Sequence, residues 1–181
     1  NTTEVETTDN STETTTTTTL NEADLSHSMF APFVDTTAWP PYDFKANSQE
    51  SGNLNYALGF LVAKSSERCE ASWGTYYELD NSELDMVTKI ATIQNSAGRV
   101  LLSFGGAANT PLAAACQSIT TLTAEYQRVI DTLHIKEIDF DIEGAFSSDT
   151  LSIERRSAAI AQLQSDNPEL KVWFTLAVLP S

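Results

Sequence analysis

The amino-acid sequence predicts an α/β fold in which strands and helices alternate around a parallel sheet. Short runs rich in aliphatic and aromatic residues, typical of strands, recur along the chain. Longer segments with apolar residues at helical spacing lie between the later runs. Regular alternation of strand and helix implies parallel pairing through right-handed crossovers. Strands are expected at residues 29–35, 54–63, 99–104, 137–144 and 170–179, and helices at residues 82–96, 123–133 and 151–165.

Such a sheet can close in two ways, as an open doubly wound sheet or as a (β/α)8 TIM barrel. No GxGxxG or GxxxxGK[ST] motif follows the first strand, which disfavours a nucleotide-binding open sheet. In a barrel, functional groups lie at the carboxyl ends of the strands. Asp35, the pair Gly105-Gly106 and Glu143 all fall at such ends. The sequence therefore favours a barrel, and five strands make it a partial one, since a complete barrel needs about 250 residues.

The helices are predicted from apolar stripes and end signals. The first has Ser82 as its expected N-cap and Gly98 as its stop signal. The second carries one stripe of residues at helical spacing, formed by Tyr126, Val129, Ile130 and Leu133. The third ends before Asn167-Pro168. Residues 43–53 are too polar for an assignment.

The strand at residues 137–144 carries an unusual row of acids. Because strand side chains alternate between two faces, Asp139, Asp141 and Glu143 share one face. Like charges this close raise one another's pKa values, which makes the row costly. A half-solvated surface strand is the ordinary explanation, but the other strands are almost wholly apolar and so buried on both faces. We therefore expect the acids to face a cavity, where a shared proton serves catalysis.

The net charge of the chain excludes some classes of binding partner. A formal net charge of −15 over 181 residues argues against nucleic acid and against anionic membranes. It suits a substrate that is neutral or carries some positive charge. No apolar run approaches the ~20 residues that span a bilayer.

Residues 1–28 differ in composition from the rest. They contain an unbroken threonine run at residues 14–19 and six acids, with no lysine or arginine. Little here can be buried to offset the entropy of ordering, so we expect a disordered acidic linker. Threonine-rich tracts of this kind are typical of stalks in exported proteins, and a linker implies a further module before it. The globular domain is then expected at residues 29–181.

The two cysteines, Cys69 and Cys116, lack the spacing of a metal site. In an exported protein they would form one disulfide, and the alternative is two unlinked thiols. The sequence favours the disulfide and a secreted location, and it calls for no cofactor or metal.

Two motifs resemble glycoside hydrolase family 18, the chitinases and their relatives. Ser103-Phe104-Gly105-Gly106 is similar to the SxGG motif of that family, and the run from Asp139 to Glu143 is similar to the end of its DxxDxDxE motif. The segment at residues 29–35 and the loop Trp39-Pro40-Pro41 also resemble bacterial-type chitinases. The likeness covers about residues 29–181. Lys136-Glu137 replaces the usual Asp-Gly at the start of the longer motif.

The resemblance implies substrate-assisted retaining hydrolysis of chitin. Glu143 would be the general acid, and Asp141 would orient the N-acetyl group of the substrate. Asp139 would share a proton with Asp141, so that the three acids titrate as a coupled set. Gly105 and Gly106 would allow close approach of the backbone to sugar or to the acidic strand, or would simply end the strand in a turn.

The tryptophans and histidines are harder to assign. Trp39 and Trp73 follow the first and second strands and are candidates for stacking on sugar rings, although each could instead be packed in the core. Trp173 lies within a strand and is expected in the core. His27 and His134 have no partner cluster and receive no role.

The sequence thus predicts a chitinase-like glycosidase, binding chitin or N-acetylglucosamine oligosaccharides. The chain is expected to be a truncated fragment, because it offers no counterpart of the tyrosine and tryptophan that the family has on later strands. On its own it is expected to have little activity. Two alternatives stay open, an endo-β-N-acetylglucosaminidase acting on N-glycans and a non-catalytic chitin-binding relative, although such relatives usually lack the acid at Glu143.

Overall fold

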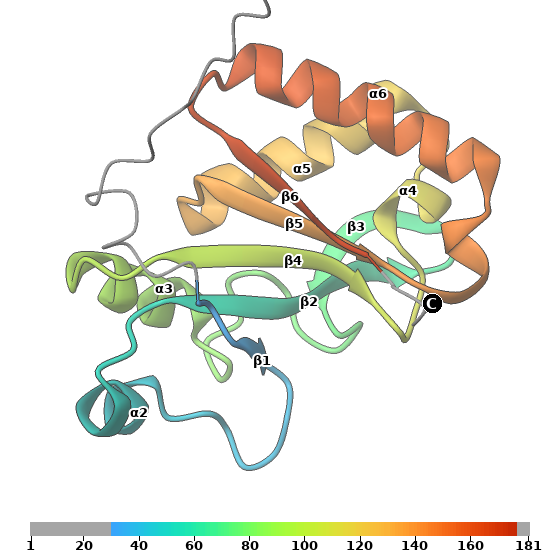
Figure 1. Ribbon diagram of the computed structural model, residues 1–181. Coiled ribbons are helices and arrows are strands. Elements are labelled where there is room, and N and C mark those ends of the chain that lie inside the picture. Colours follow the sequence, from blue (N-terminus) through green and yellow to red (C-terminus); the bar gives the residue numbers. More distant parts are fainter. Residues whose placement is uncertain (1–29, 177–181) are drawn as a thin grey trace, which may run out of the picture.

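The structure is a computed structural model that describes residues 30–176. A six-stranded sheet forms its centre, with the order β1-β2-β4-β5-β6 (Figure 1). Strand β3 lies off this order and pairs with the carboxyl-terminal half of β2. All neighbours in that order are parallel, whereas β3 runs antiparallel to β2. The strands are β1 (Phe33–Asp35), β2 (Tyr56–Ser65), β3 (Arg68–Trp73), β4 (Val100–Gly106), β5 (Glu137–Ile142) and β6 (Lys171–Thr175). The five parallel strands confirm the predicted partial barrel, which is unclosed over the described residues.

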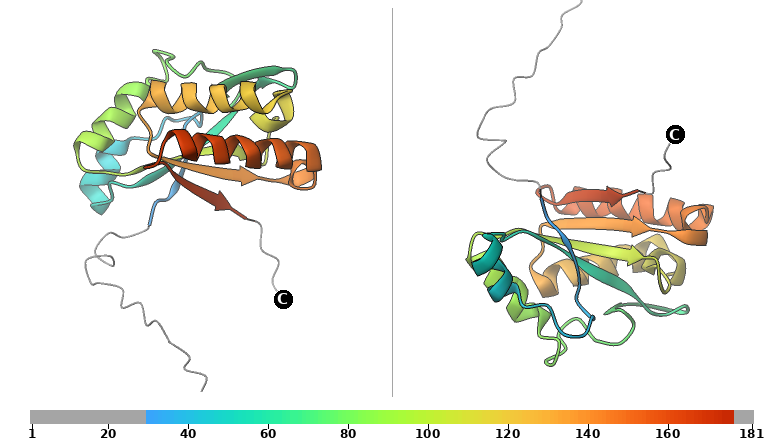
Figure 2. Two further views of the ribbon diagram at one scale, coloured as in Figure 1. Left: turned by 90° about the horizontal axis from the view of Figure 1, so that it is seen from above. Right: turned by 60° about the horizontal axis from the view of Figure 1, so that its bottom comes forward.

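The larger helices pack on one face of the sheet and leave the opposite face, the inner face of the barrel, without a helical layer (Figure 2). These larger helices are α3 (Met86–Asn95), α5 (Ile119–Leu133) and α6 (Thr150–Asp166). The fold also has three shorter helices, α2 (Phe44–Ser51), α4 (Leu112–Ala115) and η1 (Gly144–Ser147). The centre of the core is an aromatic cluster of Phe104, Tyr126 and Phe140, whose ring centroids lie 4.9–5.4 Å apart. This cluster packs α5 against β4 and β5, so it helps to fix the position of the acidic strand β5 along β4.

Helix α5 forms where its apolar stripe predicts, and it starts four residues earlier than expected. The hydroxyl of Ser118 accepts a hydrogen bond from the backbone N–H of Thr121 at 3.1 Å, which caps the first turn. Leu122 extends the buried stripe to Tyr126 and Leu133. The helix ends at Leu133, and the next residue, His134, caps it in a left-handed conformation.

Three local predictions were wrong or incomplete. Helix α3 begins at Met86 instead of Ser82, because the side chain of Asn81 accepts hydrogen bonds from the next two free N–H groups, those of Glu83 and Leu84, and so holds a turn ahead of the helix. Residues 43–53, left unassigned, contain α2, which is capped by the carboxylate of Asp43. Strand β3 was not predicted.

A disulfide joins Cys69 on β3 to Cys116 at the end of α4, with Cα atoms 4.5 Å apart. It ties the antiparallel extension of β2 to the connection that leaves β4. The threonine-rich segment at residues 1–28 lies outside the described residues, so its predicted disorder and the module before it stay predictions. Within residues 30–176, no helix is both long enough and apolar enough to span a membrane.

Candidate functional site

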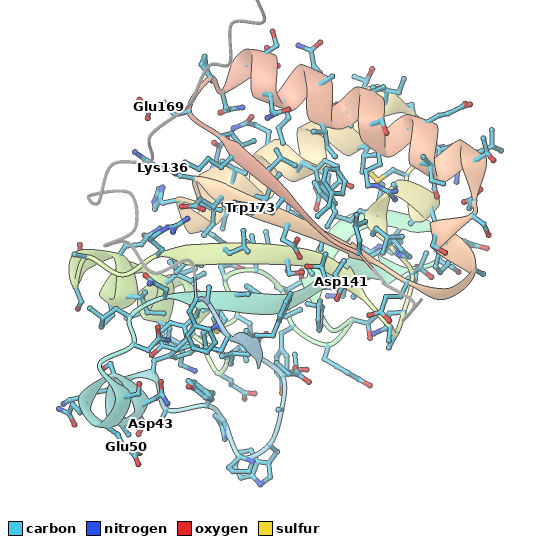
Figure 3. All side chains as sticks on the ribbon, in the orientation of Figure 1. Asp43, Glu50, Lys136, Asp141, Glu169 and Trp173 are labelled. Atoms are coloured by element: carbon cyan, nitrogen blue, oxygen red, sulfur yellow. A yellow bond between two sulfur atoms is a disulfide. The ribbon has the colours of Figure 1, made fainter. Side chains whose placement is uncertain are left out.

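The three predicted acids occupy the inner face of the barrel at increasing heights, with Asp139 and Asp141 on β5 and Glu143 directly after it. Asp139 is 1% exposed and Asp141 is 8% exposed, while Glu143 follows the strand and is exposed to solvent. Between them, Ile138 and Phe140 point to the other face and are buried beneath the helices. Asp141 lies near the carboxyl ends of the strands, whereas Lys136 lies at the opposite end of the sheet (Figure 3). The period-two alternation of β5 is therefore present in the fold.

Asp139 is held by hydroxyl groups from both neighbouring strands. Ser103 on β4 donates from its Oγ to Oδ2 of Asp139 at 2.7 Å. Thr175 on β6 has its Oγ1 at 3.1 Å from both oxygens of the same carboxylate. A buried carboxylate needs such donors, because an unsatisfied charge in this position would be strongly destabilising.

Asp141 is the acid whose proton affinity the fold changes most clearly. Burial raises its pKa from 3.8 to about 6, and the charges of Glu143 and Asp139 and a hydrogen bond with Glu143 act in the same direction. A carboxyl with a pKa of about 6 holds a proton in about half of the molecules at pH 6 and in about a tenth of them at pH 7. The three acids therefore form one interacting group that can exchange protons during a reaction.

Gly105 makes the close pairing of β4 and β5 possible, and Gly106 leaves room for the ring of Phe60 on β2. Gly105 has φ +110°, and a Cβ atom on it would overlap the backbone carbonyl oxygen of Asp141. A Cβ on Gly106, which has φ +82°, would lie 2.9 Å from the ring of Phe60. The structure thus accounts for both glycines by contact with protein, the first with the acidic strand itself.

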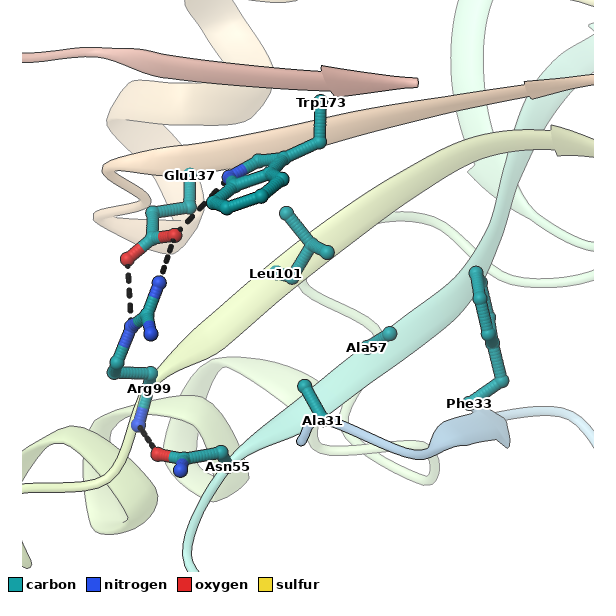
Figure 4. A pocket seen from close by; sticks show the side chains of 8 residues that line it. All are labelled: Ala31, Phe33, Asn55, Ala57, Arg99, Leu101, Glu137 and Trp173. Carbon is teal, nitrogen blue, oxygen red and sulfur yellow. Dashed lines mark hydrogen bonds and ion pairs between the residues drawn. The ribbon is translucent and has the colours of Figure 1, made fainter. Parts of the chain in front are cut away.

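An ion-pair network forms the floor of the inner face. Glu137 accepts two hydrogen bonds from Arg99, at 2.9 and 2.6 Å, and one from Nε1 of Trp173 at 3.2 Å (Figure 4). These groups line a small cavity of about 110 Å³ together with Phe33 and Leu101. The side chain of Trp173 was predicted in the core but lies half-buried on the inner face, because its indole N–H bonds Glu137 across the strands.

The two predicted stacking tryptophans differ completely in exposure. Trp39, on the loop after β1, is 88% exposed and can meet a ligand. Trp73 is 0% exposed at the end of β3, so its predicted contact with sugar was wrong and the core alternative holds. Tyr76, in the loop that follows β3, is 78% exposed and was missed. Its position directly after the turn at Gly74-Thr75 was the only available signal.

Sequence reasoning also missed Thr175. It lies two residues after Trp173 and so shares its face of β6, which was the signal that could have pointed to it. In the part of the chain that the structure describes, no group of three or more His, Cys, Asp or Glu side chains is arranged to hold a metal ion.

No protein-family model matches the chain. The chain is 36% identical over 157 residues to a probable bifunctional chitinase/lysozyme of Escherichia coli (strain K12), and 34% identical over 157 residues to Endochitinase 11 of Metarhizium anisopliae. Each match covers 84% of this chain, but it covers only 17% of the first relative and 29% of the second.

A solved structure has a similar fold. The catalytic domain of a hyperthermophilic chitinase from Pyrococcus furiosus matches with a TM-score of 0.70 and 25% identity, over 81% of this chain and 46% of that one. The described fold therefore corresponds to part of the barrel of a chitinase catalytic domain. The named relatives agree with the resemblance that the two sequence motifs carry.

Proposed function

We propose that this chain, which is related to the chitinases of glycoside hydrolase family 18, forms part of the catalytic barrel of an enzyme that hydrolyses β-1,4-linked N-acetylglucosamine polymers. The observation that carries the proposal is the row of three carboxylates along β5 and directly after it, whose exposure increases from Asp139 to Glu143. Such a gradient combines a buried charge, a carboxyl of raised pKa and an accessible acid in one line.

The proposed reaction uses the N-acetyl group of the substrate as the nucleophile. Glu143, at the open end of the row, donates its proton to the glycosidic oxygen as the bond to the leaving sugar breaks. The acetamido carbonyl oxygen attacks the anomeric carbon from the opposite face and forms a cyclic intermediate. Water then opens this intermediate, losing its proton to Glu143, and the product keeps the original anomeric configuration.

Asp141 is proposed to orient the acetamido group. Its raised pKa gives it a carboxyl proton that can be redistributed when the acetamido N–H acquires positive character. Asp139, one step deeper, is held in place by hydrogen bonds from Ser103 and Thr175, and its charge helps to raise the pKa of Asp141. This charge favours positive charge developing on the substrate.

The nature of the substrate is proposed from three features. A chitin chain is neutral, which suits the formal net charge of −15. The exposed rings of Trp39 and Tyr76 lie on loops that follow β1 and β3 and offer flat surfaces for sugar rings. The relatives are named chitinases, and one solved relative is described in complex with chito-oligosaccharides. Hydrolysis of N-glycans is the alternative, since it uses the same N-acetyl chemistry.

A secreted location is also proposed. Disulfides persist mainly in oxidising compartments, and Cys69 and Cys116 form one here. Measuring the protein in culture medium and in cell extract of its source tests this proposal. A protein found solely in the cell extract would contradict it.

The test of the proposed function compares the full-length protein with its Glu143→Gln variant on chitin oligosaccharides. Glutamine keeps the shape but cannot donate an acidic proton, so we expect the hydrolysis rate to fall by about 10²–10⁴-fold with binding retained. Glu169→Gln, at a side chain that is 86% exposed and remote from the row, is the matched control and should hydrolyse normally. Equal turnover in wild type and Glu143→Gln would refute the acid assignment. Release of N-glycans without cleavage of chitin oligosaccharides would favour the alternative substrate.

A further inference from the structure

A groove on the outer surface, between the start of α2 and helix α3, has no part in the proposed reaction. Its volume is about 420 Å³, within the range of ~300–1,000 Å³ that is usual for ligand sites. One side is formed by residues 41–45, and the other by a face of α3 between residues 88 and 93. Both helices lead into the amino ends of strands, β2 and β4, so the groove lies at the opposite end of the sheet from the acid row. Figure 3 shows Asp43 beside α2 and Asp141 near the carboxyl ends of the strands.

Two aromatic side chains form one wall of this groove. Tyr42 and Phe44 pack edge to face with ring centroids 5.0 Å apart, and Phe44 packs in the same way on the buried ring of Tyr56. Both rings of the wall are half-buried, so each keeps part of its surface open. Helix α2 itself has no buried residue, so these rings hold its start against the body of the fold. An aromatic wall fixed in this way suits the apolar face of a sugar ring.

Three polar groups that line the groove have no hydrogen-bond partner in the part of the chain that the structure describes. They are the hydroxyls of Tyr42 and Thr88 and the ammonium group of Lys45. The hydroxyl of Thr92 donates to the backbone carbonyl of Thr88 at 2.8 Å, so its oxygen can still accept a hydrogen bond. The groove therefore offers both donors and acceptors to a ligand that is rich in hydroxyl and amide groups.

The charges around the groove favour a neutral ligand. Lys45 and Lys89 bring two positive charges, and Asp43 brings one negative charge. Lys89 already donates to the backbone carbonyl of Leu84 at 2.8 Å, and Asp43 caps α2 by accepting from the N–H of Ala46 at 2.9 Å. An anionic ligand would meet one disengaged cation and a carboxylate in the same groove. A neutral ligand with oxygen acceptors can satisfy the ammonium group of Lys45 without that repulsion.

We infer that this groove is a second binding site for chains of N-acetylglucosamine, separate from the acid row. The inference rests on the proposed function, which supplies the ligand. One sugar ring lies against the wall of Tyr42 and Phe44, while its hydroxyl and acetamido groups bond Thr88 and Lys45. A polymer held at this second site stays near the acids after each cleavage, because the added contact raises the effective concentration of the chain.

Methyl NMR of the full-length protein carrying Glu143→Gln, titrated with N,N′,N″-triacetylchitotriose, tests the site directly. We expect the methyl signals of Thr88 and Ile93 to shift with ligand concentration. Adding Thr92→Arg fills the groove with a long side chain, so the apparent Kd from these signals should rise about tenfold or more. Ala91→Arg is the matched control, because Ala91 is exposed on the same helix but does not line the groove. It should leave this Kd unchanged.

Hydrolysis gives a second readout, with the catalytic acid intact. The ratio of turnover on insoluble chitin to turnover on a soluble oligosaccharide should fall about 2–10-fold in Thr92→Arg and keep its wild-type value in Ala91→Arg. If no form of the protein cleaves either substrate, the proposed function fails, but the methyl titration still decides whether the groove binds sugar. Signals of Ile93 that do not move with ligand, or that move equally in Thr92→Arg, would overturn the inference. An unchanged ratio in Thr92→Arg would overturn the role of the groove in holding the polymer.

Discussion

Replacing Asp141 with asparagine should stabilise the protein at neutral pH while it removes the proposed activity. In the folded state the pKa of Asp141 is raised from 3.8 to about 6, chiefly by burial and then by the charges of Glu143 and Asp139. Between these two pH values the folded protein binds more protons at this site than the unfolded chain does. Its stability therefore falls as pH rises through this window, and the loss is complete above pH 6.

The size of the effect follows from the two pKa values. Each pKa unit is worth about 1.4 kcal/mol, so an acid raised from 3.8 to about 6 costs roughly 3 kcal/mol of unfolding free energy once it is ionised. Asparagine is neutral at every pH and has nearly the same shape. Its stability advantage over wild type should therefore grow by roughly 2 kcal/mol between pH 4 and pH 8.

Urea unfolding followed by tryptophan fluorescence measures this difference at each pH. The exposed Asp80 provides the matched control, because Asp80→Asn changes a surface carboxylate and should alter stability by less than about 0.5 kcal/mol at either pH. The reasoning is refuted if Asp141→Asn is no more stable than wild type at pH 8, or if its advantage is the same at pH 4. Either result would mean that Asp141 is not held in a site that disfavours its charge.

Three further predictions concern the surroundings of the row. Gly105→Ala should lower stability by about 2 kcal/mol more than Gly52→Ala in the same urea assay, because both have positive φ but only Gly105 has backbone where a Cβ would lie. Burial raises the pKa of Glu137, but hydrogen bonding and charge from Arg99 outweigh it and lower the pKa. Glu137→Gln should therefore cost about 2 kcal/mol at pH 7, and the cost should shrink as pH falls below 4.5, the ordinary pKa of a glutamate. Ser118→Ala should lower the thermal midpoint by removing the cap of α5, worth about 1 kcal/mol.

The acidic strand was predictable because its pattern is short-range and strictly periodic. Alternation alone assigned Asp139 and Asp141 to one face and Phe140 to the other, and the fold has this arrangement. The parallel order of the strands was predictable for a similar reason, since helical crossovers leave few topologies open. The glycine pair was predicted to allow close approach of backbone, and Gly105 meets the backbone of Asp141.

Features that depend on contacts distant in the sequence were not predictable. Strand β3 is held by pairing with β2 and by the disulfide from Cys69, so its short polar segment gives no clear signal of its own. Ser82 is a suitable N-cap residue, but Asn81 accepts the nearby N–H groups first and delays the helix to Met86. Local propensity therefore predicted the region of α3 correctly, but it predicted the wrong first residue.

The three tryptophans show why exposure is harder to predict than position. All three follow or belong to strands, yet Trp39 is exposed, Trp73 is fully buried and Trp173 lies half-buried against Glu137. Large aromatic residues suit the core and ligand sites equally well, so residue type alone does not decide between them. What decides is which neighbour covers the ring, and that information lies in the packing of separate strands.

The roles within the acid row depend on depth along β5, which alternation does not specify. At the deepest position, the carboxyl of Asp139 accepts hydrogen bonds from two hydroxyls, which replace the water that it has lost. At the next position, Asp141 has lost water without such donors, so it holds a proton to a higher pH. At the last position, Glu143 reaches solvent and can meet a substrate. On the opposite face of the same strand, Phe140 packs on Tyr126 with ring centroids 5.4 Å apart, and this buried contact offsets part of the cost of the like charges.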